Sequence, residues 1–139
     1  MKLRAVGLVV ILATSPAYAD EAMSVAQDIA SKWQTAYNNG DATKVADLYT
    51  QDAVWVRPAE IAKGKAEIEK VVANLLKQSP NNKLTVHILG AHQNGNFVWY
   101  YNDYMFPNGP NGHAGAMLVN DGGSWHIAMH VSNVTPPKQ

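Results

Sequence analysis

Apolar residues recur at every third or fourth position in two stretches of the first half of the chain. The first set comprises Val25, Ile29, Trp33, Ala36 and Tyr37, and the second comprises Ile68, Val71, Val72, Leu75 and Leu76. This spacing places each set on one face of a helix, so we expect helices over about 24–37 and from Gly64 to about Gln78. Between them, Asp41 is a typical N-cap and predicts a short helix that extends to about Tyr49.

Alternation of apolar and polar residues replaces the helical spacing from Leu84 onward. Four strands are predicted, over 84–92, 97–106, 113–120 and 124–134, and a shorter one over 53–57. Asn94-Gly95 and Asp121-Gly122-Gly123 join them in pairs as hairpins. Helices followed by hairpin-linked strands are typical of an α+β domain. We therefore expect a curved antiparallel sheet packed on three N-terminal helices, which encloses a cavity if it curves strongly.

The last predicted strand separates two kinds of side chain. Strict alternation places Trp125, Ile127, Met129 and Val131 on one face. It places His126, Ala128, His130 and Ser132 on the other. A half-buried strand with its polar side in water explains this pattern, and so does a sheet whose second face lines a pocket.

The N-terminus has the three parts of a secretory signal peptide. Lys2 and Arg4 precede a short apolar run over 5–13, and Ala17-Tyr18-Ala19 has the small residues of a cleavage site. We predict a signal peptide over 1–19 and one exported domain, periplasmic or secreted, over 20–139 and ordered over about 22–134. The apolar run is too short to span a bilayer, so no transmembrane helix is expected.

Charge and cysteine content exclude several classes of function. Without Lys2 and Arg4 the chain has two more acidic than basic residues, and no basic cluster suggests a nucleic acid or membrane partner. The absence of cysteine excludes disulfides, thiol catalysis and thiolate metal sites. Arg57 is the only arginine of the predicted mature chain, and its planar fork suits a carboxylate or phosphate group.

The histidines do not show the spacing of a metal site. His126 and His130 are four residues apart, which on a strand corresponds to about 13 Å, too far to share one ion. His113 and His130 on facing strands, with Asp103, are the one alternative that stays open. No phosphate-binding loop or dinucleotide motif is present, and we expect neither a metal nor a cofactor.

The order of these motifs resembles the nuclear transport factor 2-like superfamily, whose members include ketosteroid isomerases, SnoaL-like polyketide cyclases and a kinase association domain. The matching residues are Ala36-Tyr37-Asn38-Asn39-Gly40-Asp41, Leu48-Tyr49-x-x-Asp52-Ala53-Val54-Trp55, Pro58, Gly64-x-x-x-Ile68 and Trp125-x-Ile127-x-x-His130-x-Ser132. The resemblance covers 22–134. It implies a cone-shaped, cystatin-like α+β roll whose inner sheet face lines a pocket and whose outer face packs a second subunit.

The resemblance also implies which residues face the pocket. By strand phase these are Trp55, Arg57, Trp99, Tyr101, Asp103, His113, Gly115, Met117, His126, His130 and Ser132, joined by Trp33 and Tyr37 from the first helix. The apolar residues Trp125, Ile127, Met129 and Val131 are then expected at a homodimer interface. An isomerase of this family needs a carboxylate where Arg57 stands and donors where Trp33 and Gly115 stand, so no steroid isomerase activity is expected.

Three functions are consistent with these residues. The first is an exported binding protein that holds a small organic acid, or a polyketide-like or steroid-like ligand, through Arg57. The second is a cofactor-independent lyase, isomerase or cyclase in which His130 and Asp103 act as an acid/base pair. The third is a dimerisation module with a filled interior. The missing isomerase residues favour the first.

Overall fold

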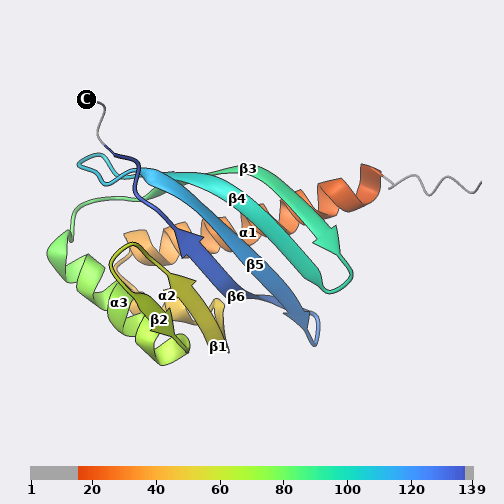
Figure 1. The fold of residues 1–139 in the computed structure, drawn as a ribbon, viewed down its shortest axis with the longest axis horizontal. Coiled ribbons are helices and arrows are strands. Elements are labelled where there is room, and N and C mark those ends of the chain that lie inside the picture. The colour runs from red at the N-terminus through yellow and green to blue at the C-terminus, as the bar shows by residue number, and fades with distance from the viewer. Residues whose placement is uncertain (1–15, 137–139) are drawn as a thin grey trace, which may run out of the picture.

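The computed structural model describes residues 16–136, so most of the predicted signal peptide, residues 1–15, lies outside the described residues. Helix α1 (Pro16–Asn38) and helix α2 (Ala42–Ala46) are followed by strands β1 (Tyr49–Val56) and β2 (Ile61–Lys63) and by helix α3 (Lys65–Gln78). Strands β3 (Thr85–Asn94), β4 (Phe97–Met105), β5 (Gly112–Asp121) and β6 (Ser124–Ser132) complete the fold (Figure 1). No helix among the described residues is long and apolar enough to cross a membrane.

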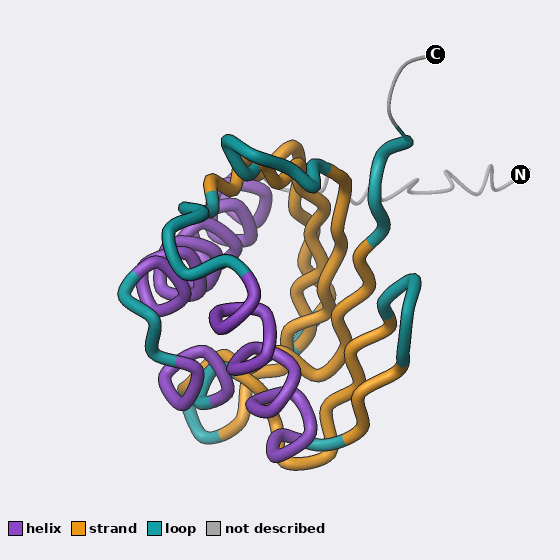
Figure 2. Tube along the Cα trace, turned by 90° about the vertical axis from the view of Figure 1, so that its left-hand side faces the viewer, coloured by secondary structure: helices purple, strands orange, loops and turns teal. Residues whose placement is uncertain are grey.

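All strands join one six-stranded sheet in the order β2-β1-β6-β5-β4-β3. Neighbouring strands are antiparallel except β1 and β6, which are parallel. Figure 2 shows the sheet curving around the helices, which all lie on its concave side. The predicted α+β class and the curved sheet on three helices are confirmed.

The core fills the space between the helices and the concave sheet face. Its fully buried large side chains include Tyr49, Ile68, Leu118 and Ile127, drawn from both halves of the chain. Three further aromatic side chains, Trp33, Tyr37 and Trp55, are at most 9% exposed. Burial of this size supplies the main favourable free energy of folding.

Some element boundaries differ from the predicted ones. Helix α1 begins at Pro16 instead of near Ser24, because the alanine-rich residues before Ser24 contain nothing that ends a helix. Strand β1 begins at Tyr49, where the short second helix was expected to end. Strand β2 was not predicted, since three residues are too few to show an alternation.

A register shift in β6 breaks the alternation that its sequence predicts. Ile127 pairs with Leu118 and Met129 pairs with Met117, so Ala128 has no partner on β5. Such a bulge turns the following residues to the opposite face. Ile127 and His130 therefore both face the concave side, whereas Met129 and Val131 face outward, and the predicted four-residue apolar face is split.

Candidate functional site

A cavity of about 300 Å³ lies between α1, α3 and the concave sheet face. Six of the predicted pocket residues line it: Trp33, Tyr37, Trp55, Arg57, His130 and Ser132. They come from α1, β1 and β6 and from the residue that follows β1. Apolar and aromatic walls with few polar groups are typical of a small-molecule site.

His130 is held by the aromatic residues around it. Its ring stacks on the Trp55 indole, with centroids 4.9 Å apart and planes 3° apart. Its Nδ1 lies 2.7 Å from the Tyr49 hydroxyl oxygen, which accepts a hydrogen bond from Trp33 Nε1 at 3.0 Å. Burial, and secondarily the nearby Arg57 cation, lower the pKa of His130 to about 4. His130 is therefore neutral at physiological pH.

Arg57 supplies the positive charge of the cavity. Its side chain is 18% exposed, and its Nη1 donates to Glu60 Oε1 at 2.7 Å. The guanidinium carbon lies 5.1 Å from the centroid of the Trp55 ring, a cation–π contact. Arg57 makes no ion pair with Asp103, which pairs with His113. Among the described residues no carboxylate other than Glu60 contacts Arg57, so most of its donors are left for another acceptor.

Further polar groups in the cavity come from positions that the sequence did not single out. Asn102 is buried, and its amide nitrogen donates to the Asp103 backbone oxygen at 3.1 Å. Tyr104 donates to the Asn133 backbone oxygen at 2.6 Å. Ser132, which was predicted, accepts from Trp55 Nε1 at 3.1 Å. Asn102 and Tyr104 alternate in phase with buried Tyr100, and this is the signal that identifies them.

Burial raises the pKa of the hydroxyl groups of Tyr37 and Tyr104, and the Arg57 charge partly offsets this effect. Tyr37, Tyr104 and Arg57 all line the cavity. The cavity therefore combines one cation with two neutral phenols. An anionic group on a ligand is stabilised there by charge as well as by hydrogen bonding.

The remaining predicted pocket residues do not line the cavity. They are Trp99, Tyr101, Asp103, His113, Gly115, Met117 and His126, and they belong to the rows that face the outer, convex side of the sheet. On β4, the buried residues are Val98, Tyr100 and Asn102, so the inward phase is shifted by one residue from the predicted one. A shift of one residue moves every side chain of a strand to the other face.

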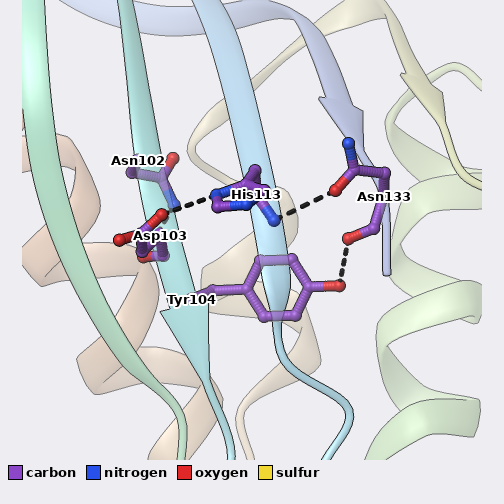
Figure 3. A network of polar contacts seen from close by, with 5 residues as sticks. All are labelled: Asn102, Asp103, Tyr104, His113 and Asn133. Atoms are coloured by element: carbon purple, nitrogen blue, oxygen red, sulfur yellow. Dashed lines mark hydrogen bonds and ion pairs between the residues drawn. The ribbon is translucent and has the colours of Figure 1, made fainter. Parts of the chain in front are cut away.

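The acid/base pair proposed from the sequence is consequently divided by the sheet. Asp103 lies on the outer face, where its Oδ1 is 2.6 Å from His113 Nδ1 (Figure 3). The backbone nitrogen of His113 donates to Asn133 Oδ1 at 3.1 Å, which joins this pair to the end of β6. His130 contacts Tyr49 instead. No group of three possible metal ligands occurs among residues 16–136, so His113, His130 and Asp103 do not assemble.

Comparisons with known proteins identify what the chain is similar to. A model of the SnoaL-like domain matches residues 30–126. A cystatin-like domain of unknown function from Nostoc punctiforme is 11% identical with a TM-score of 0.74, over 84% of this chain and 79% of that one. No curated protein matches the sequence.

Two further solved structures have the same fold. A ketosteroid isomerase-like protein from Erwinia carotovora is 20% identical with a TM-score of 0.70, over 85% of this chain and 99% of that one. An NTF-2 like protein of unknown function from Shewanella oneidensis is 15% identical with a TM-score of 0.68, over 80% of this chain and 98% of that one. At these identities the likeness shows the fold alone.

Proposed function

The chain belongs to the SnoaL-like domain family within the nuclear transport factor 2-like superfamily, and from that premise we propose that it binds a small organic acid in the cavity beside Arg57. Domains of this family commonly bind small molecules or act as isomerases. The observation that carries the proposal is a guanidinium that faces an aromatic cavity and is engaged by only one half-exposed carboxylate, that of Glu60.

The shape and polarity of the cavity indicate the kind of ligand. Trp33 and Tyr37 stack with centroids 5.3 Å apart, and Phe106 lies edge-on to Tyr37, so the walls suit a flat apolar ring system. A volume of about 300 Å³ is at the lower end of known ligand sites. We propose a ligand with one or two rings and one acid group, which includes small polyketide-like acids.

The two alternative functions have less support. An enzyme that uses His130 with Asp103 lacks its carboxylate, because Asp103 lies on the outer face and Nδ1 of His130 contacts Tyr49 instead. Steroid isomerisation is disfavoured as well, because Arg57 occupies the position at which the isomerases of this superfamily need a carboxylate base. A dimerisation module with a filled interior does not need the cavity that lies between the helices and the sheet.

Binding of a matched pair of probes tests the proposal. We expect 2-naphthoate, an aromatic acid, to bind more tightly than the uncharged 2-naphthamide, and Arg57→Met to weaken naphthoate binding by about 10- to 100-fold, the value of one or two hydrogen bonds to a charged group. Quenching of tryptophan fluorescence measures both, since Trp33 and Trp55 line the cavity.

Glu60→Gln is the matched control for this experiment. It removes the carboxylate that competes for Arg57 and keeps the cavity walls, so naphthoate binding is expected to be retained or strengthened. Equal affinity for naphthoate and naphthamide in the wild-type protein contradicts the proposal. So does an Arg57→Met variant that binds naphthoate as well as wild type does.

We further propose that the mature protein is exported and forms a homodimer through the outer sheet face. Expression of the full chain in a bacterial host is expected to give a product that begins at Asp20, which intact-mass measurement of the periplasmic fraction detects. An uncleaved, cytosolic product contradicts the signal-peptide prediction. A variant in which the small residues Ala17 and Ala19 are replaced by leucine is the control, and it is expected to retain the leader.

A further inference from the structure

The Tyr49 hydroxyl lies between two ring nitrogens at the buried end of the cavity wall. Trp33 Nε1 is 3.0 Å from the phenol oxygen, and His130 Nδ1 is 2.7 Å from it. Tyr49 is only 2% exposed, so water does not supply a third partner. The hydrogen bonding of this group is therefore decided by the three side chains themselves.

Counting protons assigns each bond a direction. An indole N–H can only donate, so the Tyr49 oxygen accepts from Trp33. The phenol has a single proton, and among the described residues His130 Nδ1 is the only acceptor within hydrogen-bonding distance of it. If Nδ1 carried the imidazole proton instead, the buried Tyr49 O–H would have no partner, which is costly. The arrangement that satisfies every group has Tyr49 donating to Nδ1.

The other nitrogen of the ring, Nε2, opens onto the cavity. It makes no hydrogen bond to any described residue. Among residues 16–136, the only side-chain nitrogen or oxygen that is both fully buried and without a partner is Gln93 Oε1. Because Nε2 also has no partner, it is not fully buried. Since His130 lines the cavity and is enclosed elsewhere by Trp33, Tyr49 and Trp55, the accessible space beside Nε2 is the cavity itself.

We propose that Tyr49 is a positioning residue that holds His130 as its Nε2–H tautomer, so that the cavity presents a neutral N–H donor in addition to the Arg57 cation. A ligand that fits this pair carries an acid group and, separated from it, an acceptor oxygen such as a ketone or ether. The ligand described here rests on the function proposed above, whereas the assignment of the His130 tautomer rests only on the hydrogen bonds of Tyr49. At neutral pH His130 then gives a hydrogen bond and does not accept a proton from a substrate.

Nitrogen NMR of the histidine rings in the ligand-free protein tests the tautomer. We expect His130 Nε2 to show the chemical shift of a protonated nitrogen and Nδ1 that of an unprotonated one, both constant around neutral pH. In Tyr49→Phe the donor to Nδ1 is lost, so the two shifts are expected to move toward each other as the tautomers mix. Tyr100→Phe, which removes a second buried phenol of the cavity without a bond to His130, is expected to leave both shifts in place.

Two results overturn the proposal. One is a protonated Nδ1 in the wild-type protein, a measurement that needs no variant to fold. The other is a folded Tyr49→Phe protein with unchanged His130 shifts. Neither result depends on naphthoate binding, so a failure of the tautomer assignment and a failure of the proposed function are separate observations.

Discussion

Substitution of Trp99 by lysine is expected to convert the proposed homodimer into monomers. In a two-fold symmetric interface each substitution occurs twice, so the loss of one aromatic anchor of about 2 kcal/mol per subunit weakens dimerisation by about 4 kcal/mol, or roughly 1,000-fold. Analytical ultracentrifugation across a concentration series of the wild-type and Trp99→Lys proteins measures this change.

The reason lies in the outer face of the sheet. Trp99, Met117 and Met129 are paired across β4, β5 and β6 and form one exposed row, each 38–44% exposed. The adjacent row adds Tyr101 and Val131, which are 49% and 42% exposed. A continuous surface of large apolar side chains is unusual on a monomer and is typical of a protein interface.

The matched control is Asn74→Lys, which adds the same charge at an exposed position of α3. Helix α3 lies on the concave side of the sheet, away from the outer face. This variant is expected to dimerise like the wild-type protein. A wild-type protein that stays monomeric at high concentration argues against the dimer, and an Asn74→Lys variant that dissociates argues against the outer face as its interface.

Periodicity predicted the fold well because each signal was local. The three helices and the hairpins at Asn94-Gly95 and Asp121-Gly122-Gly123 follow from spacing and turn chemistry over a few residues. The parallel pairing of β1 with β6 joins distant parts of the chain, and no local signal predicted it. Strand β2 is too short to produce a pattern of its own.

The site was predicted in part, and the errors have a physical origin. β4 carries aromatic or aliphatic residues in both phases, with Trp99 and Tyr101 on one face and Val98 and Tyr100 on the other, so alternation alone does not decide which face is inner. In β6 the bulge at Ala128 changes the phase within the strand. His130 was assigned to the cavity from the resemblance to the superfamily, although the strict alternation does not continue through the bulge.

Acidification from about pH 6.5 to 4 is expected to destabilise the folded protein by about 3 kcal/mol through His130 alone. Burial lowers the pKa of His130 from 6.5 in the unfolded chain to about 4 in the native state. Between these values the unfolded state binds a proton that the native state does not bind. The stabilisation is thus fully present above pH 6.5 and is lost as the pH falls toward 4. Urea unfolding at a series of pH values measures this slope.

His130→Asn separates this effect from the titration of carboxylates, which also reduces stability in acid. Asparagine does not titrate, so the variant, although less stable at neutral pH, is expected to lose about 3 kcal/mol less than the wild-type protein over the same pH interval. His87→Asn, on the exposed face of β3, is the control for removing a histidine as such. An imidazole that water reaches freely is not penalised for taking up a proton. If the free energy of unfolding falls equally with pH in the wild-type and His130→Asn proteins, this result therefore contradicts the enclosure of the ring between Trp55, Trp33 and Tyr49.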